Sequence, residues 1–290
     1  MSDDGRFALV VIALLGNPFS PGYASARARG DARPLDFCSL HVALHSPRGD
    51  LWSLTERAIP ESARRPDEVS FGRSRVAIDR GALVLDLHEH TTPLRGLIEG
   101  RVTLHPEIAS PVPVALDTAG QHRWWPVAPL ARVEVELRSP RVHFQGLGYH
   151  DANAGSVPID ASFSGWTWSR ARLRGSRDQV AVAYDVVELS GDEHARGMIF
   201  DGRGAGPLER TWRAPLPATA WRLGRSCAAD EGHAAHVQRS LTDSPFYARS
   251  LVRTRLLGRD ALAMHEVLSA ERLRRAWVRF LLGFRMRRAT

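Results

Sequence analysis

The sequence predicts an all-β protein, built as a sandwich or barrel of short antiparallel strands. Runs in which apolar and polar residues alternate recur along the chain, and this is the pattern of a half-buried strand. Turn signals separate the runs about every ten residues, and most of the 18 prolines and 24 glycines fall between them. The 290 residues suffice for about two domains of roughly 150 residues each, or for one large β domain.

The first expected strand is the apolar run 7–15. It is far shorter than the roughly 20 residues that a membrane-spanning helix needs. Asp3 and Asp4 precede it and no clear small-residue cleavage site follows, so it does not resemble a signal peptide. Gly81 closes an expected hairpin at a position where a tight turn requires a positive φ angle. The remaining strands are expected, in chain order, at 37–44, 51–55, 75–78, 83–87, 101–105, 132–137, 180–187, 197–200 and 261–268.

The last segment, 273–290, is expected to form a short basic amphipathic helix or tail. The apolar residues that recur there at helical spacing are Leu273, Trp277, Phe280, Leu281 and Phe284. The arginines on the opposite side are Arg272, Arg275 and Arg279. Such a helix can lie on an anionic bilayer surface, and it can equally well pack its aromatic side chains against the β domain.

The composition excludes several classes of protein. All 39 basic residues are arginines, the formal charge is +7 and the isoelectric point is near 10.5. The arginines are scattered among acidic residues, and no RNA-binding signature or zinc-finger spacing is present, so we expect no nucleic-acid partner. Two cysteines, Cys38 and Cys227, are too few for a disulfide framework, a four-cysteine zinc site or an iron–sulfur cluster.

The middle of the chain carries the residues that suggest chemistry. Four of the eight tryptophans lie within 45 residues of one another, at positions 124, 125, 166 and 168. A period of two would place His122 and Trp124 on one face of a strand, and likewise Tyr149 and Asp151. Asp151 stands between glycines and can be a turn residue, just as a tryptophan cluster can be ordinary core. The alternative is an aromatic-walled pocket that holds one carboxylic acid.

The same region resembles a known family. The pattern Gly-x-Gly-Tyr-x-Asp-x-Asn-x-Gly at 146–155, followed by Trp-x-Trp-Ser-Arg at 166–170, is similar to the carotenoid 1,2-hydratases (hydroxyneurosporene synthases) of purple phototrophic bacteria. The resemblance extends over nearly the whole chain. Its other matching runs are 11–13, 19–23, 36–43, 55–57, 100–106, 132–137, 245–249 and 265–269.

The resemblance implies a fold of two lipocalin-like antiparallel β-barrel or sandwich domains that needs no metal or organic cofactor. It also implies addition of water to the terminal C1=C2 bond of an acyclic carotenoid, such as neurosporene or lycopene. The family pattern places the catalytic residues at Asp151, His122, Tyr149 and Trp124, with Asp151 as the proton donor. The substrate-binding residues are then Trp125, Trp166, Trp168 and Asn153. Ala154 departs from the pattern at a position where we expect a bulky aromatic residue in relatives, and His150, between Tyr149 and Asp151, is a second departure. Both can alter the substrate preference.

This chemistry explains the residue types. An alkene is a very weak base, whereas an aspartic acid with its usual pKa near 4 is ionised in the cell. Burial in an apolar, tryptophan-lined site can raise the pKa and keep the acid neutral. Protonation at C2 leaves a cation at C1, which the faces of Trp124 and Tyr149 can stabilise, and His122 can reprotonate Asp151 or orient the water.

The expected domains are an N-terminal lipocalin-like domain at 1–126, a C-terminal one at 127–272 and the basic tail at 273–290. A polyene substrate resides in a membrane, so we expect a cytoplasmic protein that associates peripherally with the inner (intracytoplasmic) membrane. Two other functions stay open at this point. One is a non-catalytic isoprenoid carrier, and the other is an enzyme that protonates another isoprenoid and cyclises or isomerises it.

Overall fold

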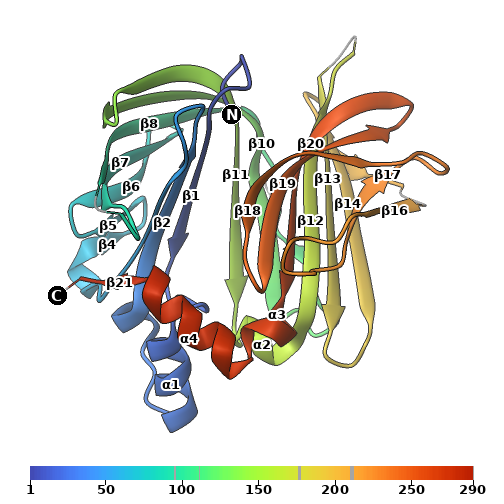
Figure 1. Cartoon of the computed structure of the whole chain (residues 1–290). Coiled ribbons are helices and arrows are strands. Elements are labelled where there is room, and N and C mark those ends of the chain that lie inside the picture. The colour runs from blue at the N-terminus through green and yellow to red at the C-terminus, as the bar shows by residue number, and fades with distance from the viewer. Residues whose placement is uncertain (95, 111, 176–177, 210–211, 290) are drawn as a thin grey trace. The chain divides into compact units, whose positions relative to one another are not determined.

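The computed structural model describes residues 1–94, 96–110, 112–175, 178–209 and 212–289, and it is an all-β fold with a few short helices, as predicted (Figure 1). The chain forms two compact units. Unit 1 comprises Met1–Glu107, Ala131–Tyr149 and Arg279–Thr290, and unit 2 comprises Ile108–Leu130 and His150–Val278. The units interleave in sequence because two long strands, β10 (His122–Ser139) and β11 (Val142–Gly155), continue from one unit into the other. The division at 126 and 272 stays a prediction.

Unit 1 contains two sheets. One has the strand order β1-β2-β3-β21, and the other continues from β11 and β10 through β8-β7-β6-β5-β4. Arg80 and Gly81 both have positive φ angles, 50° and 82°, which is the geometry of the predicted tight turn between β6 and β7. The elements are β1 (Ala8–Leu14), α1 (Pro21–Arg29), η1 (Pro34–Phe37), β2 (Cys38–His45), β3 (Leu51–Arg57), η2 (Glu61–Ala63), β4 (Arg64–Arg65), β5 (Glu68–Phe71), β6 (Ser74–Asp79), β7 (Ala82–His90), β8 (Leu97–Ile108) and β21 (Arg287–Arg288).

Unit 2 is built on a seven-stranded antiparallel sheet with the order β15-β14-β13-β12-β20-β19-β18, accompanied by the hairpin β16-β17. Short α2 precedes β12, and α3 follows β20. The elements are β9 (Val114–Ala115), α2 (Ile159–Ser162), β12 (Phe163–Leu173), β13 (Gln179–Glu188), β14 (Glu193–Asp201), β15 (Gly204–Pro207), β16 (Trp212–Leu216), β17 (Arg225–Ala229), β18 (His236–Asp243), β19 (Tyr247–Leu256), β20 (Arg259–Ser269) and α3 (Ala270–Leu273).

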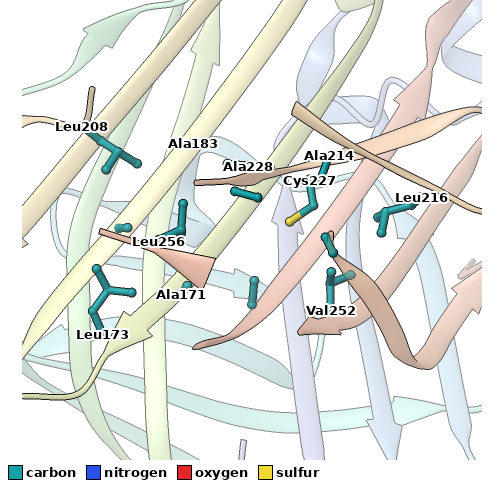
Figure 2. Packing of buried hydrophobic residues seen from close by; sticks show 14 residues of the cluster. Ala171, Leu173, Ala183, Leu208, Ala214, Leu216, Cys227, Ala228, Val252 and Leu256 are labelled. Carbon is teal, nitrogen blue, oxygen red and sulfur yellow. The ribbon is translucent and has the colours of Figure 1, made fainter. Parts of the chain in front are cut away.

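One face of the seven-stranded sheet is covered by a core of small and aliphatic side chains. Ala171 pairs with Ala181 and Ala263 on its two neighbouring strands, and such small residues let the β16-β17 hairpin approach closely. Cys227 of β17 is buried against this surface, as Figure 2 shows. The core thus occupies one face of the sheet, and Trp168, Tyr184 and Glu266 of the same strands point to the other face.

The C-terminal segment forms the predicted basic amphipathic helix, with two differences. Leu273 does not join the exposed apolar face, because it ends the separate helix α3 and is buried. The second helix, α4 (Ala276–Arg285), is followed by β21, which pairs in parallel with β3. Trp277, Phe280 and Phe284 are exposed, whereas Val278 is buried. Within the described ranges, no helix is long and apolar enough to span a bilayer.

Candidate active site

Four side chains form a row across the seven-stranded sheet of unit 2. Trp168 of β12 pairs directly with Tyr184 of β13 and with Glu266 of β20. Glu266 in turn pairs with Arg249 of β19. Directly paired residues of an antiparallel sheet point to the same side, so this row lies on the face opposite the alanine-rich core.

A second row lies two residues further along the same face. Leu268 of β20 pairs with Trp166 of β12 on one side and with Tyr247 of β19 on the other. The ring of Trp166 lies edge-on to Tyr184, with centroids 5.7 Å apart, and edge-on to Tyr247 at 6.2 Å. Edge-to-face contacts at these separations are favourable beyond the area that they bury. The two rows make one connected aromatic cluster.

An ion pair is buried within the cluster. The Nε atom of Arg249 donates to the Glu266 carboxylate at 2.7 Å, and the Arg249 side chain is only 3% exposed. Its guanidinium also lies 5.4 Å from the centroid of the Tyr247 ring. Burial disfavours the charge of Arg249, but Glu266, Tyr247 and Asp151 together more than compensate and raise the pKa of the guanidinium. The pair is therefore a fixed source of charge in an apolar environment.

Asp151 of β11 meets this cluster through Trp124. The indole Nε1 of Trp124, which is fully buried, donates to the Asp151 carboxyl at 3.0 Å. The Trp124 ring also lies edge-on to Tyr184, with centroids 5.6 Å apart. Burial raises the pKa of Tyr184 well above its usual value, and the nearby Asp151 adds to this effect. Asp151 lies within a strand and is not a turn residue, so the turn interpretation is wrong.

His122 begins β10 on the same face as Trp124. Both are buried while Arg123 and Trp125 are exposed, which confirms the period of two predicted for this segment. The His122 Nε2 atom lies 3.0 Å from the Ser162 hydroxyl, and its ring centroid lies 4.7 Å from that of Phe163. Burial lowers the pKa of His122 despite the nearby Asp117, so the imidazole is neutral at pH 7.

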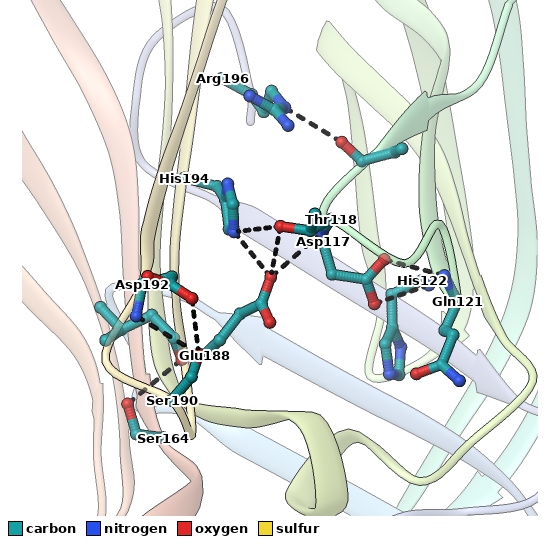
Figure 3. A network of polar contacts seen from close by, with 12 residues as sticks. Asp117, Thr118, Gln121, His122, Ser164, Glu188, Ser190, Asp192, His194 and Arg196 are labelled. Carbon is teal, nitrogen blue, oxygen red and sulfur yellow. Dashed lines mark hydrogen bonds and ion pairs between the residues drawn. The ribbon is translucent and has the colours of Figure 1, made fainter.

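The loop before β10 is fixed by a polar network, shown in Figure 3. The Asp117 carboxylate accepts the backbone N–H groups of Gln121 and His122, at 2.8 and 3.1 Å. The next residue, Thr118, contacts Glu188, which also binds His194 at 2.6 Å. These contacts set the start of β10 and hence the position of His122.

The remaining residues singled out by the sequence lie further from Asp151 or nearer the surface. Tyr149 is half-buried, two residues before Asp151 in β11, and Asn153 is exposed. Trp125 is 39% exposed on the face of β10 opposite Trp124, and its indole donates to the Ser110 carbonyl at 2.6 Å. The structure thus brings together Asp151, Trp124 and, through the aromatic contacts, Trp166.

Sequence reasoning did not identify Tyr184, Tyr247, Arg249 and Glu266 as members of the site. Arg249 and Glu266 lie in runs that resemble the family, but no role was inferred for them. Two opposite charges in strands that are otherwise largely buried are a signal in themselves, because ionised groups are rarely buried unless they are paired.

The fold and the cluster define a lipocalin-like, all-β protein in which the Asp151 carboxyl group contacts a cluster of tryptophan and tyrosine rings. Such a site suits acid chemistry on an apolar substrate. The chain belongs to the carotenoid hydratase CrtC family, whose profile matches residues 11–290.

Curated relatives that match over nearly the whole chain carry the name acyclic carotenoid 1,2-hydratase. The protein from Rubrivivax gelatinosus is 40% identical and that from Thiocapsa roseopersicina 39%, each over 99% of this chain and 71% of the relative. The protein from Cereibacter sphaeroides is 32% identical over 96% of this chain and 98% of the relative. Among solved structures, a protein from Nitrosomonas europaea that is provisionally described as AttH shares the fold. Its TM-score is 0.58 at 12% identity, with 81% of each chain covered.

Proposed function

We propose that this chain is an acyclic carotenoid 1,2-hydratase, a hydro-lyase that needs no cofactor. It adds water to the terminal C1=C2 bond of a substrate such as neurosporene or lycopene and gives the 1-hydroxy carotenoid. The observation that carries the proposal is the hydrogen bond from the Trp124 indole to Asp151, within a cluster of aromatic rings. The names of the relatives support the same reaction.

Asp151 is the proton donor in this proposal. The neutral carboxylic acid transfers its proton to C2, the C1=C2 π bond breaks and a tertiary cation forms at C1. An apolar environment favours the neutral acid over the carboxylate, and the indole N–H holds the carboxyl group in one orientation. A side-chain acid placed in this way contributes about 10²–10⁴-fold to the rate.

The aromatic residues stabilise the cation. Trp124, Trp166 and Trp168 are buried or half-buried near Asp151 in unit 2, and Tyr149 precedes Asp151 in its strand. A desolvated cation over an aromatic face gains about 2 kcal/mol. Each 1.4 kcal/mol of selective transition-state stabilisation gives about a tenfold increase in rate.

His122 returns a proton to Asp151 after the reaction. Its lowered pKa keeps it neutral at pH 7, so it can accept a proton and pass it on. Trp125 and Asn153 lie nearer the surface, where they contact the outer part of the long polyene.

The test is product formation from lycopene or neurosporene in liposomes with heavy-oxygen water, read by mass. The parent is expected to form labelled 1-hydroxy carotenoid, and Asp151→Asn is expected to lose at least about 100-fold of this activity. The control is Asp192→Asn, which changes an exposed aspartate of the same unit. Equal activity in Asp151→Asn would exclude Asp151 as the donor. Bound polyene without product from the parent would indicate a carrier instead.

We also propose that the protein lies on the cytoplasmic face of an anionic membrane. Phe280, Leu281 and Phe284 of α4 are exposed, at 67%, 39% and 68%. The neighbouring arginines of the same unit are Arg279, Arg285, Arg287 and Arg288. Exposed aromatic residues beside cations favour binding to anionic lipid headgroups, and this contact would bring the enzyme to its membrane-dissolved substrate.

A further inference from the structure

On the aromatic face of unit 2, the indole Nε1 of Trp166 is buried without a hydrogen-bond partner among the described residues, and the buried hydroxyl of Tyr247 has the Glu266 carboxylate as its hydrogen-bonding neighbour. Both residues belong to the second row of the sheet, and their ring centroids lie 6.2 Å apart. Buried polar groups are almost always paired, so an indole N–H without a partner beside a phenol oxygen that can still accept a hydrogen bond needs an explanation in the function of the site.

The surroundings of Tyr247 keep its hydroxyl protonated. Burial is the largest effect on its pKa, Arg249 opposes it, and Glu266 adds to it, with the result that the pKa lies well above the usual value. A neutral phenol both donates and accepts a hydrogen bond. Tyr247 can therefore receive a hydrogen bond from one group and pass a proton to Glu266.

The hydration reaction requires a second polar position besides Asp151. Water must attack the cation at C1 and then lose a proton, and Asp151 cannot position that water while it delivers its own proton to C2. Glu266 is a second carboxylate within the aromatic cluster, and the 2.7 Å bond from Arg249 holds it in place. A buried water needs two or more polar partners, and Trp166 and Tyr247 supply two.

We propose that Trp166 and Tyr247 hold the attacking water and that Glu266, positioned by Arg249, accepts its proton through Tyr247. This inference rests on the proposed hydratase function. The indole N–H donates to the water oxygen, and the water donates one hydrogen to the Tyr247 oxygen. As the new C1–O bond forms, this hydrogen moves to Tyr247 and the phenolic proton moves to Glu266. Glu266 later releases the proton to solvent and Asp151 regains one through His122, so the sum is alkene plus water giving alcohol.

Loss of this water position should separate the two halves of the reaction. In Tyr247→Phe, Asp151 still protonates C2, but the cation is captured poorly. It then returns to an alkene by losing a proton from C2 or from a methyl group on C1 to the Asp151 carboxylate. In heavy water, deuterium consequently enters the recovered polyene. We expect alcohol formation to fall about 100-fold, while deuterium exchange stays within about threefold of the parent.

The experiment measures alcohol and polyene-bound deuterium for the parent, Tyr247→Phe, Trp166→Phe and Asp151→Asn. Tyr23→Phe is the control, because Tyr23 lies in unit 1. Trp166→Phe keeps an aromatic face but removes the N–H donor, so it should repeat the partition of Tyr247→Phe. Asp151→Asn should lose both signals.

Two results would overturn the inference alone: alcohol formation at the parent rate in both aromatic variants, or a parallel loss of alcohol and deuterium exchange in both. The parallel loss would show a merely structural role. A parent that yields neither alcohol nor exchange would overturn the proposed function itself, and the inference with it.

Discussion

At the scale of single residues, unit 2 places ionisable groups among aromatic and apolar side chains. Asp151 and Tyr184 both contact Trp124, and the Arg249–Glu266 pair lies in the same row of side chains as Tyr184. A buried ionisable group costs stability unless it is paired or neutral, so burial favours one protonation state over the other. The proposed proton transfer from Asp151 depends on such an effect, because the donor must be a neutral acid.

His265 provides a test of this principle away from the reaction. It is fully buried, its Nε2 atom donates to the Ser226 carbonyl at 2.9 Å, and burial lowers its pKa from 6.5 to about 4. Below pH 6.5 the unfolded chain takes up a proton that the folded chain does not. The free energy of unfolding should therefore be highest above pH 6.5 and fall toward pH 4, by about 2 kcal/mol at pH 5 from this residue.

Urea unfolding at pH 7.5 and pH 5 measures this contribution. His265→Leu is expected to lose stability at both values but to depend less on pH than the parent. The matched control, His236→Leu, changes an exposed histidine and should keep the parent's dependence. An unchanged pH dependence in His265→Leu would refute the assignment.

At the scale of elements, close approach between strands constrains the sequence. Gly100 of β8 has a φ angle of 152°, and a Cβ atom added there would lie 2.2 Å from the Glu136 carbonyl of β10. Gly100→Ala should therefore lower the free energy of unfolding by about 2–4 kcal/mol, from strain and steric overlap together. Denaturant unfolding measures the loss. At Gly224 an added Cβ meets nothing within 4 Å, so Gly224→Ala is the control, and equal effects would contradict the prediction.

The strands could be predicted to a large extent because alternation is a local signal. Every predicted run overlaps a strand, including 101–105 within β8 and 180–187 within β13. The predicted runs did not include several long strands, among them β11, β12, β18 and β19. Short edge strands such as β4 and β15 were also missed, because four or fewer residues give no periodicity. Leu273 was misplaced since its spacing fits the helix that follows it, whereas α3 ends at that residue.

The candidate site was predictable only in part. Trp124 and Asp151 were found from their sequence pattern, but the hydrogen bond between them depends on how β10 and β11 are placed together. Arg249 and Glu266 come together because β19 and β20 pair in one particular register. A shift of one residue would send one of the two side chains to the opposite face, and no local pattern fixes that register.

At the scale of the whole molecule, the exposed face of α4 predicts binding to anionic vesicles. Replacing both Phe280 and Phe284 by serine should weaken binding to phosphatidylglycerol vesicles about 100-fold, because two inserted aromatic rings contribute about 3 kcal/mol. Cosedimentation measures the affinity. The control is Leu257→Ser, which removes an exposed apolar residue outside α4 and should leave the affinity for the vesicles unchanged. If the double variant binds the vesicles as tightly as the parent, the exposed face of α4 is not the membrane contact. If salt does not weaken binding, the arginines do not contribute to the affinity.

The two cysteines have a consequence for measuring how the molecule opens. Cys38 lies in unit 1 and Cys227 in unit 2, neither forms a disulfide, and both side chains are almost completely inaccessible to solvent. An alkylating reagent reaches either one only when the surrounding strands separate, and the alkylated peptide reveals which one reacted. The chain therefore carries one intrinsic reporter in each unit. The ratio of the two modification rates under native conditions distinguishes halves that open together from halves that open independently.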